Sequence, residues 1–82
     1  MVAQLRAFLI ALEEGSLNRA AVRLRMSQFV LSRQMQALEA EIGGALLERT
    51  TGGVRPTDAG HALASTMRLS LKRRSLQTAR RI

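Results

Sequence analysis

The chain has 82 residues, which is enough for one small domain, and it contains no cysteine, which excludes disulfides and thiolate metal sites. Thirteen basic residues outnumber six acidic ones, all but one of the basic residues are Arg, and the net charge of +7 favours a polyanionic partner. The absence of Trp and Tyr, with only two Phe, disfavours the stacking used by single-strand binders.

The first segment has the pattern of an amphipathic helix. Apolar residues recur at i, i+3, i+4 and i+7 from Leu5 to Leu12, which predicts a helix from about Val2 to Glu14 that ends before Gly15. The apolar run of residues 7–12 is too short for a membrane span or a signal peptide. The two acids that follow it are expected to form a solvated helix end.

A second, shorter helix is expected to end at about Leu24. Asn18 is the predicted N-cap, and Leu17 and Val22 are spaced as the two members of a hydrophobic staple. The adjacent Ala20 and Ala21 would allow another helix to approach closely, although Ala is also simply a good helix former.

Ser27 is the predicted N-cap of a longer helix that ends at the pair Gly43 and Gly44. A helical wheel places four apolar residues on the face toward the core: Leu31, Met35, Leu38 and Ile42. The opposite face is expected to point outward: Phe29, Ser32, Arg33, Gln36 and Ala40. Acidic residues are confined to the C-terminal half of this helix, so an anionic partner would meet its N-terminal half, where the helix dipole is also favourable.

The next segment, "ALLERTTGGVRPT", has two short strands on either side of a "TTGG" turn and predicts a small hairpin. Arg49 and Arg55 flank the turn. Pro56 ends the second strand, and Thr57 with Asp58 begins a final helix that runs to the end of the chain.

The final helix has two apolar stripes, one of Ala62, Leu69 and Leu76 and the other of Leu63, Met67 and Leu71. A surface helix of a small monomer needs only one stripe, so the second predicts packing against a partner helix, with dimerisation as the expected cause. The helix reaches the end of the chain without a capping Gly or Pro, and we therefore expect a piece of a longer protein.

Catalytic and metal-binding chemistry are not expected. His61 is the single histidine and has no acidic or Cys neighbours at ligand spacing. The serines have no histidine that would activate them. We predict no catalytic residue, no metal site and no cofactor.

A short helix, a tight turn, a second helix with hydrogen-bonding groups at its start and a following hairpin indicate a winged helix-turn-helix. The predicted fold class is mainly α: three helices with a small β-hairpin wing, followed by a long linker helix. Duplex DNA is the expected partner. Two other classes stay open, namely a basic RNA- or ribosome-associated module and a helical protein-interaction or membrane-surface module. The few aromatics count against the first, and the wing counts against the second.

The sequence also resembles a known family. The elements "EEGSL.RAA..L..SQ", "LSRQ...LE.E.G..L.ER" and "T.AG" occur in that order and spacing, and they are similar to the N-terminal domain of LysR-type transcriptional regulators over nearly the whole chain. The resemblance implies a winged helix-turn-helix in residues 1–57 and a linker helix in residues 58–82 that pairs antiparallel in a homodimer. It further implies an effector-binding domain absent from this chain, which would bind a small molecule, and a tetramer as a possible full-length assembly.

By resemblance, Gln28, Ser32 and Arg33 would read bases in the major groove. Arg49 and Arg55 would serve the wing region, with a structural or phosphate-positioning role as the alternative for Arg49. Phe29 stands where relatives usually have Pro. Its ring would either contact a thymine methyl or a sugar, or pack back on Met26.

The predicted DNA-binding residues are therefore Gln28, Phe29, Ser32, Arg33, Gln36, Arg19, Arg49 and Arg55. The predicted dimerisation residues are Ala62, Leu69 and Leu76. We expect a cytoplasmic bacterial regulator, associated with the nucleoid, that binds duplex DNA as a symmetric dimer without membrane contact.

Overall fold

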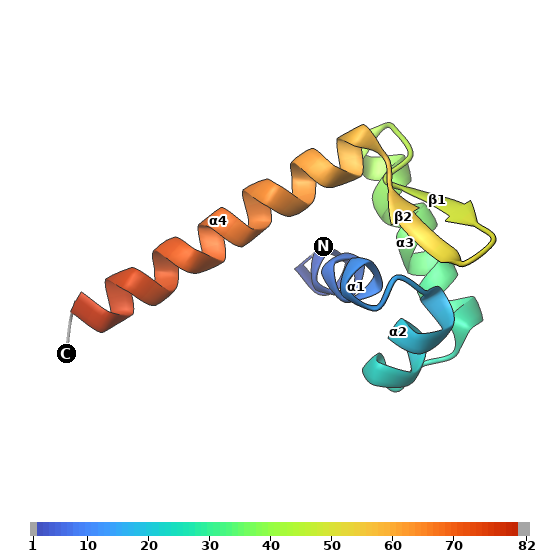
Figure 1. Ribbon diagram of the computed structural model, residues 1–82, viewed down its shortest axis with the longest axis horizontal. Helices are drawn as coiled ribbons and strands as arrows, with labels where there is room; N and C mark the ends of the chain where they lie inside the picture. Colours follow the sequence, from blue (N-terminus) through green and yellow to red (C-terminus); the bar gives the residue numbers. More distant parts are fainter. Residues whose placement is uncertain (1, 81–82) are drawn as a thin grey trace.

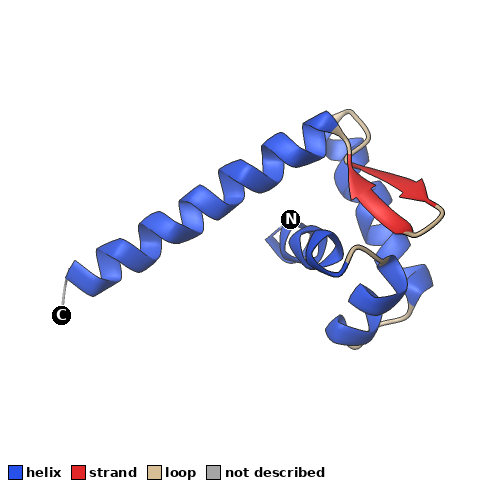
Figure 2. Ribbon diagram, in the orientation of Figure 1, coloured by secondary structure: helices blue, strands red, loops and turns tan. Residues whose placement is uncertain are grey.

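The computed structural model describes the backbone of residues 2–80 and the side chains of residues 2–70. Its elements in chain order are α1 (Val2–Glu14), α2 (Leu17–Leu24), α3 (Gln28–Ile42), β1 (Leu47–Thr50), β2 (Gly53–Pro56) and α4 (Asp58–Arg80). The first three helices pack together, the hairpin lies beside α3, and α4 leads away from this body (Figures 1 and 2). This arrangement confirms the predicted winged helix-turn-helix with a long final helix.

Most helix ends lie where local sequence signals place them. α1 ends at Gly15, whose φ is +66°, and the Gly15 N–H donates to the Ala11 carbonyl at 2.9 Å. The Ser27 hydroxyl accepts a hydrogen bond from the Val30 N–H at 3.1 Å and caps α3. α3 ends at Ile42 and is capped by Gly43, which has a left-handed φ of 89° that glycine adopts without steric cost.

The predicted start of α2 was wrong. Its N-cap is Ser16, not Asn18, because Ser16 has an extended backbone and its hydroxyl accepts from the Arg19 N–H at 3.2 Å. Leu17 is therefore already helical and is buried. Val22 is 74% exposed, so the expected staple between these two residues is absent.

The core lies where α1, α3 and the segment before β1 meet. Its largest fully buried side chains are Phe8, Leu31, Leu38 and Leu46. Ala20 and Ala21 of α2 are buried as well, and their small side chains bring that helix close to its neighbours. Ile42, expected in the core, is instead 46% exposed, because it is the last residue of α3 and Leu46 fills the core beyond Leu38.

The hairpin is anchored to the helices at both of its ends. β1 and β2 pair antiparallel, with Thr50 opposite Gly53, and the Val54 N–H donates to the Gly15 carbonyl at 3.0 Å. At the other end the Glu39 carboxylate of α3 accepts hydrogen bonds from the N–H groups of Leu46 and Leu47, at 2.7 and 3.2 Å. The wing is thereby held against the turn before α2 and against α3.

α4 begins with the predicted cap. The Thr57 hydroxyl accepts from the Gly60 N–H at 3.1 Å and donates to the Ala45 carbonyl at 2.7 Å. One stripe of α4 faces the body, where Ala64 is buried and Leu63 and Met67 pack against the core.

The other stripe of α4 points away from the body. Ala62 is exposed and Leu69 is 62% exposed. The side chains of Leu71 and Leu76 lie outside the described residues. The two stripes therefore have different environments in the first turns of the helix.

Candidate nucleic-acid interface

The outward face of α3 and the wing together form one shallow surface hollow of about 400 Å³. We call it the α3 hollow, and its lining residues are Gln28, Phe29, Ser32, Arg33, Gln36 and Arg49. Five of them come from α3 because Leu31, Met35 and Leu38 occupy the buried face of the same helix and leave this face to solvent. Arg49 reaches the hollow from β1.

Two predicted residues form a pair within the α3 hollow. The guanidinium carbon of Arg33 lies over the ring of Phe29, 5.7 Å from the ring centroid. Phe29 is 71% exposed, whereas Met26 packs against the core. The ring is thus part of the outer surface of α3.

The charge of the hollow is positive at the N-terminal half of α3. Arg33 and Arg49 supply two guanidinium groups, and neither has a salt bridge to another described residue. Glu39 lies toward the other end of α3, where its carboxylate is occupied by the two backbone N–H groups before the wing. Glu39 is not among the residues that line the α3 hollow, although it lines the adjoining depression together with Ser32, Gln36 and Arg49.

The two arginines of the wing lie on opposite faces of the hairpin. Arg55 pairs across the hairpin with Glu48, to which its Nε donates a hydrogen bond, and it is not part of the α3 hollow. Arg49 occupies the neighbouring position on β1 and points to the other face, because side chains alternate along a strand. Only Arg49 of the two joins the α3 residues.

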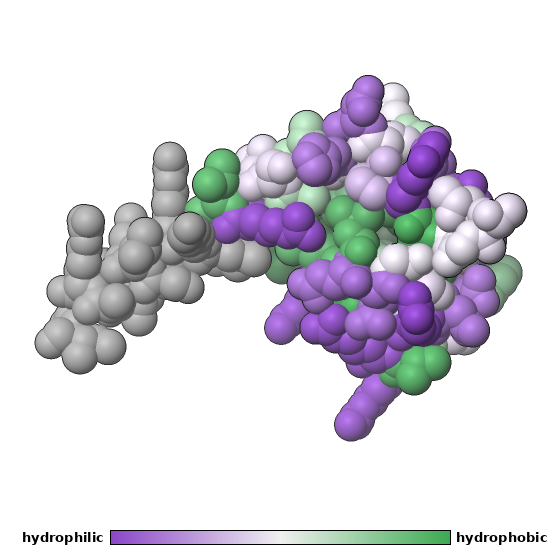
Figure 3. All heavy atoms as spheres, viewed as in Figure 1, coloured by the Kyte–Doolittle hydropathy of each residue, from purple (hydrophilic) through white to green (hydrophobic). Residues whose placement is uncertain are grey.

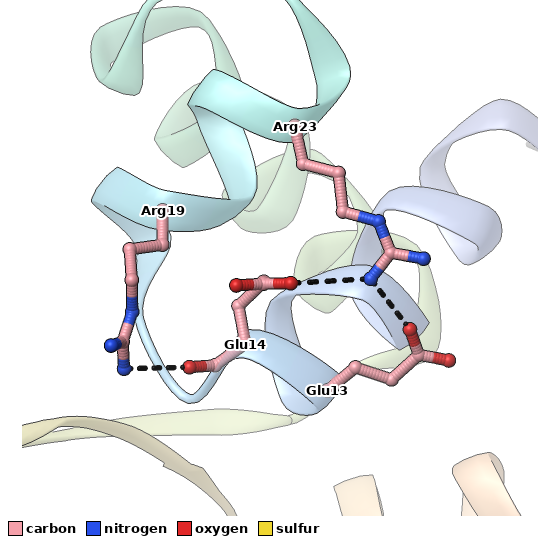
Figure 4. Close-up of polar contacts among 4 residues, drawn as sticks. All are labelled: Glu13, Glu14, Arg19 and Arg23. Atoms are coloured by element: carbon pink, nitrogen blue, oxygen red, sulfur yellow. Dashed lines mark hydrogen bonds and ion pairs between the residues drawn. The ribbon is translucent and has the colours of Figure 1, made fainter.

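Arg19 and Arg23 hold the turn between α1 and α2 (Figure 4). The Arg19 Nη2 donates to the Glu14 carbonyl at 2.9 Å, outside the α3 hollow. Arg23 donates to the carboxylates of Glu13 and Glu14 at 2.8 and 3.2 Å, and these hydrogen bonds, that to Glu13 first, raise the pKa of Arg23 above its ordinary value. The two acids at the end of α1 are solvent-accessible as expected, and in addition they pair with Arg23 of α2.

Within residues 2–70, whose side chains are described, no group of three His, Cys, Asp or Glu is arranged to hold a metal ion. His61 lies exposed on α4. Over the same residues, no helix is both long and apolar enough to cross a membrane.

The sequence and the fold both match known proteins. Residues 2–61 match the model of the bacterial regulatory helix-turn-helix proteins of the lysR family. The HTH-type transcriptional regulator TcbR of Pseudomonas is 46% identical over 69 residues, which cover 84% of this chain. The same match covers 24% of TcbR, so the chain spans about a quarter of that relative's length.

Two crystal structures of DNA complexes share the fold. The CbnR DBD–DNA complex has a TM-score of 0.80 and 44% sequence identity, covering 98% of this chain and 94% of that one. The complex of BenM DBD with catB site 1 DNA has a TM-score of 0.80 and 37% identity, covering 100% and 93% of the two chains. With its winged helix-turn-helix and its match over residues 2–61, this chain belongs to the lysR family of bacterial regulatory helix-turn-helix proteins.

Proposed function

We propose that this chain is the DNA-binding part of a LysR-type transcriptional regulator and that it reads duplex DNA by sequence without catalysing a reaction. The observation that carries the proposal is the α3 hollow, which gathers amides, a hydroxyl and two guanidinium groups on one exposed surface. The DNA present in the CbnR and BenM complexes supports the same partner for this chain. As a bacterial regulator it would act in the cytoplasm.

In this proposal α3 enters the major groove with its N-terminal half. Arg33 donates to O6 and N7 of a guanine, while Gln28 and Gln36 have the amide groups that recognise N6 and N7 of adenine. Ser32 is placed for either a base or a phosphate. Arg49 contacts the phosphate backbone from the wing and holds α3 in register.

Two further predicted residues, Arg19 and Arg55, receive roles outside base reading. Arg19, next to the N-terminus of α2, is assigned a phosphate contact, although its side chain also bonds the end of α1. Arg55 bonds Glu48 through its Nε only, so its Nη groups would serve a phosphate contact. Phe29 lies on the same surface as Arg33.

The proposal is tested by titrating the chain against a random-sequence duplex pool, single-stranded RNA and vesicles of anionic lipid, followed by selection of bound duplexes. We expect binding to duplex DNA with a selected consensus. A preference for the RNA would instead support an RNA- or ribosome-associated module, and a preference for the vesicles would support a membrane-surface module. Either preference would contradict the proposal.

Two substitutions separate base reading from phosphate contact. Arg33→Ala is expected to weaken binding to the selected duplex by about 1 to 3 kcal/mol and to relax preference at one position per half-site. Arg49→Ala is expected to weaken all duplexes about equally and to lower the salt dependence by about one charge. Arg6→Ala is the control, since Arg6 is exposed on α1 outside the α3 hollow and should leave the base preference unchanged.

We also propose a homodimer formed through α4, with residues 1–57 as the DNA-binding unit and residues 58–82 as the linker. Leu69 is 62% exposed on the stripe that faces away from the core. Apolar surface is visible on the described part of α4 in Figure 3. Two copies would then read two half-sites separated by about 34 to 36 Å or a multiple of it.

Leu69→Glu should shift the protein toward monomer in sedimentation, because it places a charge in the proposed apolar contact. Ser70→Glu adds the same charge at the next exposed position and should leave a larger dimer fraction. Equal dimer fractions for both variants and the wild type would remove Leu69 from the interface. A domain for a small-molecule effector and a tetrameric assembly are proposals for the full-length regulator.

A further inference from the structure

We propose that Phe29 is a specificity residue: its ring selects a thymine through the C5-methyl group and positions Arg33 for a guanine in the neighbouring base pair. This inference rests on the proposed binding of duplex DNA. It predicts that the Phe29–Arg33 pair of α3 prefers a thymine next to a guanine.

The exposure of Phe29 is the first observation. A phenyl ring that is 71% exposed in the first turn of α3 is available to a partner, and its removal from water on binding would be favourable. The ring lines the α3 hollow together with hydrogen-bonding side chains. In the major groove the apolar group available to such a ring is the C5-methyl of thymine.

The position of Arg33 is the second observation. Residues 29 and 33 are four apart on a helix and therefore neighbours on one face. The guanidinium carbon of Arg33 lies over the Phe29 ring at 5.7 Å from its centroid, within the range of a cation–π interaction. This contact restricts a long side chain that would otherwise sample many rotamers, which reduces the entropy lost when Arg33 binds a base.

The stacked arrangement leaves Arg33 able to read a base. A cation–π contact is an attraction between the charge and the ring face, so it leaves the N–H donors of the guanidinium available for O6 and N7 of guanine. The ring and the guanidinium lie close together on one face of α3, and we therefore assign them to neighbouring base pairs.

The test uses the wild-type 82-residue chain and the duplex selected from the random pool. Each thymine is replaced in turn by deoxyuridine, which removes only the C5-methyl group. We expect about a fourfold loss of affinity, the equivalent of one buried methyl group, at one thymine per half-site. Replacing the adjacent guanine by 7-deazaguanine, which removes the N7 acceptor, should cost at least about fivefold.

Two variants assign these effects to the ring. Phe29→Ala should abolish the deoxyuridine penalty and reduce the 7-deazaguanine penalty. Phe29→Leu keeps an apolar side chain but has no π face, so it should retain the first penalty and reduce only the second. Because the ring is exposed, both variants should unfold at the wild-type temperature, which circular dichroism checks before binding is measured.

The outcomes separate this inference from the proposed function. A selected duplex whose affinity is unchanged by deoxyuridine at every position would overturn the role of Phe29 and leave sequence-specific binding intact. Equal 7-deazaguanine penalties in wild type and Phe29→Leu would overturn the positioning of Arg33 by the ring. Failure to select any duplex would overturn the proposed function and this inference together.

Discussion

Gly60 lies inside the first turns of α4, where helix propensity and tertiary packing make opposite predictions for alanine. In an exposed helix, replacing Gly by Ala stabilises the protein by about 1 kcal/mol. Here a Cβ at Gly60 would collide with the carbonyl oxygen of Leu46 and lie 3.0 Å from its carbonyl carbon. The obstacle is backbone, which cannot rotate away as a flexible side chain can.

The size of the effect follows from these two contributions. Overpacking a rigid site costs about 1 to 3 kcal/mol, and a backbone obstacle places Gly60→Ala at the upper end, about 3 kcal/mol. Subtracting a helix gain of about 1 kcal/mol leaves a net loss of about 2 kcal/mol. For a domain of this size the melting temperature should fall by roughly 8 to 16 °C.

Urea unfolding followed by far-ultraviolet circular dichroism measures this loss, at one protein concentration for all variants because dimerisation would shift the midpoint. Gly44→Ala is the control, since a Cβ there meets no atom within 4 Å and should be neutral or stabilising by up to about 1 kcal/mol. A Gly60→Ala variant as stable as the wild type would contradict the close approach of the α4 backbone at Gly60 to the Leu46 carbonyl.

The same unfolding assay tests two other contacts. Ser16→Ala should lower the free energy of unfolding by about 1 kcal/mol because it removes the N-cap of α2. Asn18→Ala should change it by less than about 0.5 kcal/mol. A larger loss for Asn18→Ala than for Ser16→Ala would identify Asn18 as the cap. Glu39→Ala should cost about 1.5 to 3 kcal/mol, because two backbone N–H groups before β1 lose their charged acceptor. The exposed Glu41, replaced by Ala, should cost less than about 0.5 kcal/mol, and equal losses for the two acids would contradict the role of Glu39.

Part of the candidate site could be predicted from residue spacing alone. The period of α3 separates Leu31, Met35 and Leu38 from the outward residues, and burial of the first three is confirmed. The inclusion of Arg49 in the α3 hollow required the wing to be placed beside α3. The pairing of Arg55 with Glu48 depends on the hairpin register, which a turn signal does not specify to the residue.

Local signals in the sequence were sufficient for the element order and for most helix ends, because caps, glycine stops and apolar periodicity act within a few residues of the chain. The family motifs are also local features of the sequence, and they were sufficient to predict the winged helix-turn-helix. The tertiary structure decided which residues meet across elements: Arg23 with the acids of α1, Gly60 against Leu46, and an open end of α3 that exposes Ile42. It also placed the Phe29 ring on the surface under Arg33, because the fate of an exposed side chain depends on what the rest of the fold leaves uncovered.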